Sequence, residues 1–159
     1  MNNYLYISTE KQQLAFYQDN KLDFIMDVST GQNGTGQDLN SGKTPQGWHQ
    51  IIEKFGECAP ANTVFIGRAA TGEIFKPSMK QSMPERDWIL TRILRLKGLE
   101  PDLNLGGNVD TYERYIYLHG TPDDTKLGTI GSKGCIRMHN QDIIKLFNLT
   151  TIGTPVYIQ

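Results

Sequence analysis

The sequence predicts a mainly β fold. Short apolar runs with alternating or aromatic character recur along the chain, as half-buried strands require. The 16 glycines cluster between these runs, where tight connections favour them. Only one segment, near the C-terminus, combines a helical pattern with start and stop residues.

The first part of the chain predicts a strand followed by a hairpin. The strands are expected at residues 4–7, 13–17 and 21–29, and the pair Asp19-Asn20 supplies the turn between the last two. Apolar and acidic residues alternate in the third run, which indicates a half-buried strand.

The remaining segments predict further strands, long loops and one helix. Strands are expected at residues 48–55, 64–66, 115–118 and 155–158, and loops at 30–47, 76–85 and 99–111. Residues 87–96 fit both a strand and a short helix. The clearest helix covers 141–149, with Asn140 as N-cap and Gly153 closing it.

The composition fits one globular domain. We interpret the 159 residues as a single domain, 1–159, long enough to bury a core without disulfides or metals. The formal net charge of −1 gives no electrostatic basis for binding nucleic acid or an anionic membrane surface. No window approaches the roughly 18 apolar residues that a membrane-spanning helix needs.

The N-terminal segment shows no secretory signal, because it has no basic region followed by an apolar region and a small-residue cleavage site. If Met1 is the natural start, we expect a cytoplasmic protein. If the natural chain is longer, a periplasmic location is the alternative. The oligomeric state is not predicted.

The segment 114–138 holds the candidate chemistry. An apolar run ends at His119, which is followed by a Gly-Thr-Pro turn. In a later tight turn, Cys135 directly follows Gly134. A thiol and an imidazole are the two parts of an activated nucleophile with its base. We expect Gly134 to turn consecutive N–H groups to one side as an oxyanion hole, and Lys133 and Arg137 to lower the thiol pKa. The Gly120 carbonyl could fix the tautomer of His119.

Other candidate residues have simpler interpretations. Cys58 lacks such neighbours and is interpreted as structural. His49 and His139 are interpreted as satisfied surface or helix-end histidines. The glycine-rich loop 30–47 has no phosphate-binding motif followed by a convincing helix, so we interpret it as a loop bordering a groove. No metal site and no cofactor are expected, since His119 and Cys135 have no further ligands at suitable spacing.

Several motifs together give the chain a resemblance to the L,D-transpeptidase catalytic domain, or YkuD, family. They are His119-Gly120-Thr121, the run Ser132 to Met138, and the ending Gly153-Thr154-Pro155-Val156. Upstream, Ser29-Thr30-Gly31 and Thr44-Pro45 with Gly47 resemble the family's STG and TPxG stretches. The resemblance covers nearly the whole chain. It implies a β-sandwich with a few short helices.

The resemblance also implies roles for individual residues. Cys135 would be the nucleophile, His119 the base, and the Gly120 carbonyl the group that orients His119. The N–H groups of Lys133, Gly134 and Cys135 would hold the oxyanion. Ser132 and Arg137 would contact substrate, with Arg137 either binding a carboxylate or holding the loop. One position departs from the family, which usually has a histidine where this chain has Lys133.

The implied reaction is cysteine-dependent acyl transfer on peptidoglycan stem tetrapeptides. The cysteine would attack the carbonyl of the L-centre of diaminopimelate and expel the terminal D-Ala. Because a cytoplasmic location is expected, we favour an L,D-carboxypeptidase of muropeptide recycling, in which water hydrolyses the thioester. An L,D-transpeptidase that forms 3–3 cross-links or exchanges D-amino acids is the alternative, and a non-catalytic muropeptide-binding domain is the third.

Overall fold

The computed structural model describes residues 2–159. Its strands, in chain order, are β1 (Tyr4–Ser8), β2 (Gln13–Gln18), β3 (Lys21–Ser29), β4 (Gly47–Phe55), β5 (Thr63–Ile66), β6 (Ala69–Ile74), β7 (Ile89–Gly98), β8 (Tyr117–Gly120), β9 (Ile136–Met138) and β10 (Pro155–Ile158). The helices are α1 (Pro77–Ser82), the single 3₁₀ turn Gly107–Val109 and α2 (Asn140–Leu149). The mainly β prediction is confirmed.

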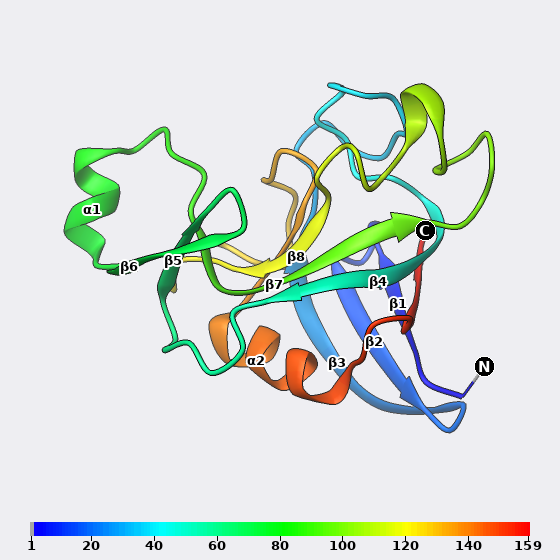
Figure 1. Cartoon of the computed structure of the whole chain (residues 1–159), viewed down its shortest axis with the longest axis horizontal. Helices are drawn as coiled ribbons and strands as arrows, with labels where there is room; N and C mark the ends of the chain where they lie inside the picture. Colours follow the sequence, from blue (N-terminus) through cyan, green and yellow to red (C-terminus); the bar gives the residue numbers. More distant parts are fainter. Residues whose placement is uncertain (1) are drawn as a thin grey trace.

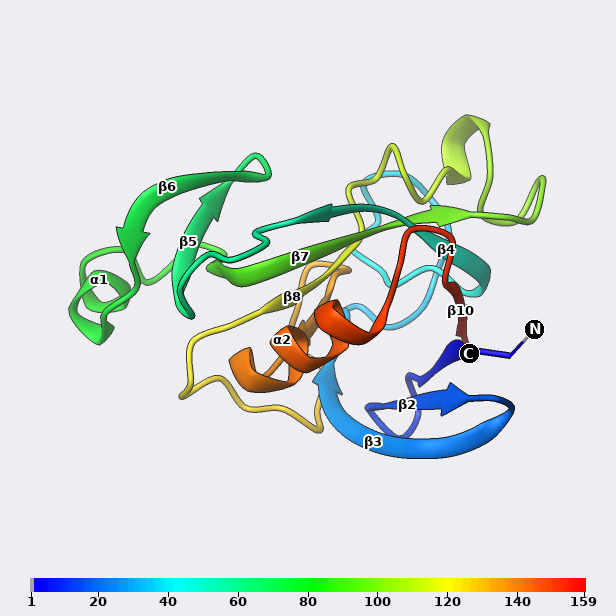
Figure 2. The same ribbon diagram turned by 60° about the horizontal axis from the view of Figure 1, so that its bottom comes forward.

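The strands form one continuous sheet that closes on itself. Their order is β4-β10-β1-β2-β3-β9-β8-β7-β5-β6, and an additional pairing of β4 with β7 joins the two sides. Figure 1 shows the β5–β6 hairpin and α1 extending from this closed part at one end. Figure 2 shows β4, β7 and β8 in one layer, β2 and β3 in the other, and α2 between them at one side.

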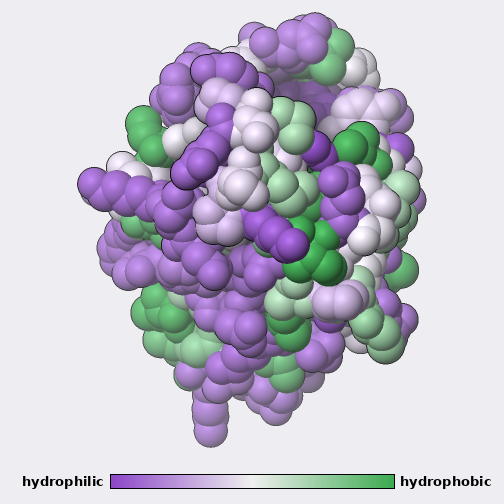
Figure 3. All heavy atoms as spheres, turned by 90° about the vertical axis from the view of Figure 1, so that its left-hand side faces the viewer, coloured by the Kyte–Doolittle hydropathy of each residue, from purple (hydrophilic) through white to green (hydrophobic). Residues whose placement is uncertain are grey.

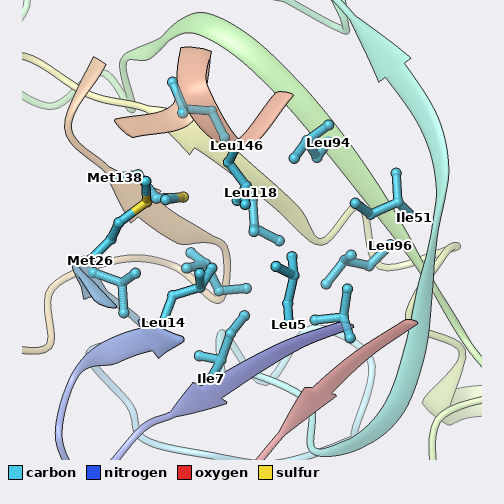
Figure 4. Close-up of a cluster of buried hydrophobic side chains, with 14 of the residues drawn as sticks. Leu5, Ile7, Leu14, Met26, Ile51, Leu94, Leu96, Leu118, Met138 and Leu146 are labelled. Carbon is cyan, nitrogen blue, oxygen red and sulfur yellow. The ribbon is translucent and has the colours of Figure 1, made fainter. Parts of the chain in front are cut away.

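The main core lies between these two layers and under α2. Leu5 and Ile7 of β1 face Leu94 and Leu96 of β7, while Leu146 of α2 points toward Leu118 of β8 (Figure 4). These side chains are fully buried. Burial of apolar surface from both layers is therefore what holds β8 and β9, the two strands of the candidate site, in place.

The ambiguous segment 87–96 is a strand. It lies in β7, a central strand paired with β4, β5 and β8 and buried along nearly its whole length. Its apolar residues do not alternate with exposed ones, because Arg95 on the other face is covered by the ring of Tyr112 at 3.5 Å. A strand buried on both faces loses the period-two pattern that identifies a strand in a sequence.

Four sequence predictions are corrected. The expected loop 76–85 contains helix α1, with Pro77 in its first turn. Strand β6 was not predicted, since its residues are all exposed and carry no periodicity. The strand expected at 115–118 begins at Tyr117. Helix α2 ends at Thr150, whose N–H and hydroxyl both donate to the Leu146 carbonyl, and Gly153 lies beyond it.

Within residues 2–159, no helix is long and apolar enough to cross a membrane. The end of the molecule that carries α1 is dominated by hydrophilic side chains, with hydrophobic ones scattered among them (Figure 3).

Candidate active site

The loop that carries Cys135 enters strand β9 through a turn that requires glycine. Gly134 has φ 124°, and a Cβ there would lie 3.0 Å from the Lys43 carbonyl oxygen. The Ser132 hydroxyl donates to the Cys135 carbonyl at 2.5 Å and accepts from the Gly134 N–H at 3.1 Å. The turn therefore holds the cysteine at the start of a buried strand.

The Cys135 thiol is held in its neutral form. Its Sγ accepts from the Tyr117 N–H at 3.3 Å, and the S–H donates to the Tyr115 carbonyl at 3.4 Å. Although part of the residue is exposed, burial of the thiol raises the pKa of Cys135 to about 12, against the opposing effects of the Tyr117 N–H and of Arg137. The sequence expectation that flanking cations give a low thiol pKa is therefore wrong for the ligand-free protein.

His119 lies in β8 with both ring nitrogens in defined surroundings. Its Nδ1 is 2.6 Å from the Gly120 carbonyl oxygen, as expected from the sequence. Because a carbonyl only accepts, Nδ1 carries the proton, and Nε2 presents a lone pair. Nε2 is buried and has no hydrogen-bond partner within residues 2–159. Burial lowers the pKa of His119, so the imidazole is neutral.

The pairing of β8 and β9 brings the thiol and the imidazole to one face. These parallel strands pair Leu118 with Ile136 and His119 with Arg137. Side chains alternate along a strand, so Cys135 lies on the same face as Arg137 and His119. The structure therefore brings the predicted pair together diagonally across two neighbouring strands, and it describes no hydrogen bond between Sγ and Nε2.

Ser132 and Arg137, which were expected to contact substrate, make hydrogen bonds to other parts of the protein. Ser132 is buried and its hydroxyl is fully occupied within the cysteine loop. The Arg137 guanidinium donates to the Gly131 carbonyl at 3.0 Å and pairs with Asp87 at 3.2 Å. Ser132 thus shapes the loop rather than a substrate surface. Of the two roles expected for Arg137, these contacts favour holding the loop.

The expected oxyanion hole is only partly present. The Gly134 N–H already donates to Ser132, so it is not free to stabilise an oxyanion. None of the described hydrogen bonds is donated by the N–H of Lys133 or Cys135. These two amides remain candidates. The Lys133 side chain is exposed and lines a hollow of about 360 Å³ together with Arg114, Tyr115 and Ile116.

The STG and TPxG stretches support the cysteine loop through hydrogen bonds. The Thr30 carbonyl accepts from the N–H groups of Gly131 and Ser132, both at 2.9 Å. The Thr44 hydroxyl donates to the Gly134 carbonyl at 2.9 Å and accepts from the Gly31 N–H at 2.8 Å. These contacts explain the role of the STG and TPxG stretches. Thr30 in the first and Thr44 in the second support the turn that carries Cys135.

Sequence reasoning missed a support on the other side of the site. Strand β7 has a bulge between Leu90 and Ile93, opposite His119 and Gly120, and Thr91 there has φ 76°. A β-branched residue rarely adopts that conformation, and such strain concentrates at functional sites. The Thr91 hydroxyl donates to Asn140 Oδ1 at 2.5 Å, and Asn140 Nδ2 donates to the Thr121 carbonyl at 3.0 Å.

Asn140 is therefore not the N-cap of α2. That place belongs to His139, and the buried Asn140 amide links the helix to β7 and to the segment after Gly120. A Cβ at Gly120 would collide with Asn140 Oδ1, which explains the glycine after the histidine. The sequence signal was an asparagine at a helix start, which a capping role explains equally well.

Other cysteine and histidine residues lie apart from this site. Cys58 is exposed, with φ 62°, and is not packed in a core. His49 is buried, not on the surface as expected, but it is satisfied by the Gly47 carbonyl at 3.0 Å and the Thr111 hydroxyl at 2.9 Å. His139 is exposed at the start of α2. In the described part of the chain, no three His, Cys, Asp or Glu residues are grouped as metal ligands.

The sequence pattern of the L,D-transpeptidase catalytic domain family, YkuD, matches residues 2–158. The chain belongs to this family.

Individual relatives support the same assignment. The chain is 26% identical to the Bacillus subtilis protein YqjB over 161 residues, covering 98% of this chain and 70% of that protein. It is 40% identical to Bacillus subtilis YkuD over 60 residues, covering 35% of this chain and 37% of that protein.

Solved structures show the same fold. An L,D-transpeptidase from Mycobacterium smegmatis matches with a TM-score of 0.62 at 19% identity, over 99% of this chain and 58% of that one. An L,D-transpeptidase from Xylanimonas cellulosilytica matches with a TM-score of 0.63 at 16% identity, over 99% of this chain and 60% of that one. The chain thus spans well under two thirds of these proteins.

Proposed function

We propose that this protein is a cysteine acyl transferase that acts on peptidoglycan stem tetrapeptides. The observation that carries the proposal is the imidazole of His119, whose Nδ1 is held by the Gly120 carbonyl and whose Nε2 has no described partner, on the face that also carries Cys135. A neutral imidazole with an available lone pair beside a neutral thiol is suited to general-base catalysis.

The first half of the reaction forms a thioester. Sγ of Cys135 attacks the carbonyl of the L-centre in the third residue, while its proton passes to Nε2 of His119. The N–H groups of Lys133 and Cys135 are the candidate donors to the oxygen that becomes negative. When the tetrahedral intermediate collapses, the C–N bond breaks and the D-Ala nitrogen takes the proton back from His119. D-Ala leaves as a neutral amine.

The second half depends on the acyl acceptor. Two hollows are lined by residues close to Cys135 in the chain, one by Lys133 and the other by Arg137. Two hollows suit a donor and an acceptor peptide, which supports an amine acceptor and hence L,D-transpeptidation. Hydrolysis, the L,D-carboxypeptidase reaction that we expected for muropeptide recycling, uses the same thioester with water instead. A cytoplasmic location stays a prediction that fractionation would test.

Product analysis separates these outcomes. The protein is incubated with a disaccharide tetrapeptide or the free tetrapeptide, with and without an added D-amino acid, and the products are followed by mass. Cross-linked dimers or exchange of the terminal D-Ala show transfer to amines, and loss of D-Ala alone shows hydrolysis. Binding without turnover would support the non-catalytic alternative.

Replacing either member of the proposed pair tests the mechanism. Cys135→Ala should abolish thioester formation, seen as loss of a protein adduct of the tripeptide by mass spectrometry. His119→Ala should reduce turnover by at least about a hundredfold, since general-base catalysis contributes roughly that much. Full turnover by Cys135→Ala would overturn the proposed function.

A further inference from the structure

A second hollow beside the cysteine loop has a composition that the proposed chemistry does not explain. It has a volume of about 290 Å³ and lies between α1, the segment before β7 and the loop after β8. Arg137 of β9, two residues after Cys135, forms part of its wall. We call it the Arg86 pocket, after Arg86 in that wall. A ligand group in this pocket would therefore contact the strand that follows Cys135, although neither Cys135 nor His119 lines the pocket.

The Arg86 pocket has an excess of positive charge. Four cations line it, namely Lys80, Arg86, Lys126 and Arg137, against the single carboxylate of Asp124. Lys80 pairs with Asp124 at 3.1 Å, and Arg137 pairs with Asp87 at 3.2 Å. For Arg86 and Lys126, no ion pair is described within residues 2–159. Two positive charges thus remain without a protein counter-ion.

The pocket also contains buried donors without acceptors. Trp88 is only 5% exposed, and its Nε1 has no hydrogen-bond partner in the described part of the chain. The same is true of Nη2 of Arg86, whose guanidinium stacks 4.1 Å above the Trp88 ring. Buried donors are nearly always satisfied in folded proteins, but both atoms have almost no exposed surface, so a ligand acceptor would reach Nη2 of Arg86 only if the Arg86 side chain moved.

We propose that the Arg86 pocket binds a carboxylate of the donor stem peptide, with Arg86 and Lys126 supplying the positive charge. A carboxylate has only acceptor oxygens, and a guanidinium matches its geometry with two parallel hydrogen bonds. The inference rests on the proposed function for the identity of the peptide. Arg137, engaged with Gly131 and Asp87, keeps the loop in place while Arg86 takes the role of carboxylate ligand.

Two kinds of carboxylate in a stem tetrapeptide have this chemistry. One is the terminal carboxylate of the leaving D-Ala, and the other is a side carboxylate of an inner residue. Peptides in which one or the other is converted to an amide separate them, because an amide removes the charge with little change in shape.

Binding to the Cys135→Ala protein tests the pocket without turnover. Calorimetric titration is done with the tetrapeptide acid and with each amide. We expect one amide to bind about tenfold or more weakly than the acid, and Arg86→Gln to remove this preference by weakening the acid to the same degree. Arg86→Lys should keep part of the preference, since the charge remains.

Lys126 provides a second variant. Because its side chain is exposed, its replacement should leave the fold intact. Lys126→Gln should weaken binding of the acid several-fold and reduce its salt dependence. Lys21→Gln, which removes the same charge at the start of β3, should bind like the parent protein. If Arg86→Gln and Lys126→Gln both keep the full preference for the acid, the pocket does not bind a carboxylate.

Failure of this inference can be told apart from failure of the proposed function. If the unmodified protein turns over the tetrapeptide normally and the pocket variants keep the full preference for the acid over the amide, only the inference about the pocket is overturned. Charge-dependent peptide binding that both variants weaken, in a protein that never releases D-Ala, would overturn the proposed catalysis and support the pocket.

Discussion

At the scale of single residues, the site combines a neutral thiol with a neutral imidazole. The S–H of Cys135 donates to the Tyr115 carbonyl, and Nδ1 of His119 is engaged with the Gly120 carbonyl. The protein does not store a reactive thiolate in this state. In the reaction that we propose, proton transfer to His119 is coupled to attack on the bound substrate, which would limit side reactions of the cysteine.

This arrangement predicts an unusual order of thiol reactivity. In the absence of substrate, iodoacetamide at pH 7 to 8 should modify exposed Cys58 before Cys135, because the pKa of Cys135 is raised to about 12. Peptide mass mapping over time measures the order. Cys58→Ser and Cys135→Ala identify each signal, and faster modification of Cys135 would contradict the neutral-thiol description.

Lys133 is the residue at which the sequence resemblance predicts a departure from the family pattern. Its side chain is exposed beside the hollow lined by Arg114 and Tyr115. Lys133→His should change the rate of D-Ala release by no more than about twofold, as for other exposed substitutions, while changing the ratio of amine to water products. Both are read from one mass-spectrometric time course. A gain in D-Ala release above tenfold would instead show that lysine at this place limits catalysis.

At the scale of elements, the site depends on supports from three directions. The Thr30 carbonyl and the Thr44 hydroxyl hold the cysteine loop. Across the site, the bulge of β7 and the start of α2 meet at Asn140, beside the segment that follows His119 and Gly120. Strand pairing determines the positions of His119 and Cys135. The hydrogen bonds made by Thr30, Thr44 and Asn140 hold the segments around them.

Asn140→Ala tests the support from α2. The change leaves the Thr121 carbonyl and the Thr91 hydroxyl without their buried partner, so the free energy of unfolding should fall by about 2–3 kcal/mol. Urea unfolding measures the loss. Gln141→Ala changes the exposed neighbour in the same helix and should cost less than about 0.5 kcal/mol. Equal effects of the two variants would contradict a linking role for Asn140.

At the scale of the whole molecule, buried neutral histidines couple stability to pH. Burial lowers the pKa of His49 from 6.5 to about 4, and burial also lowers the pKa of His119. The unfolded chain therefore binds protons that the folded protein does not bind. The free energy of unfolding should fall as the pH falls from about 6.5 to about 4, by roughly 3 kcal/mol for His49.

Urea unfolding at several pH values measures this dependence. His49→Gln should be less stable at pH 7 but should lose less stability on acidification, because the titrating group is absent. His139→Gln, at the exposed start of α2, should keep the pH dependence of the unchanged protein. If His49→Gln and the unchanged protein lose the same stability between pH 7 and 4, His49 does not titrate as described.

Local features of the fold could be predicted from the sequence alone. Turn pairs and alternation predicted the β1–β3 region, and apolar spacing predicted α2, because these signals involve residues close together in the chain. The sequence also supplied the motifs that place the chain in its family. The exposed β6 and the doubly buried β7 were not determined, since burial that is uniform along a strand leaves no period to detect.

The surroundings of the Cys135 thiol and of Asn140 come from long-range packing. Thiol pKa depends on burial as well as on charge, and burial around Cys135 comes from strands far apart in the sequence. The same holds for Asn140, whose partners come from β7 and from the segment after β8. Neighbours in the chain predicted which residues form the candidate site, while long-range packing sets the protonation state of their side chains and the contacts that support them.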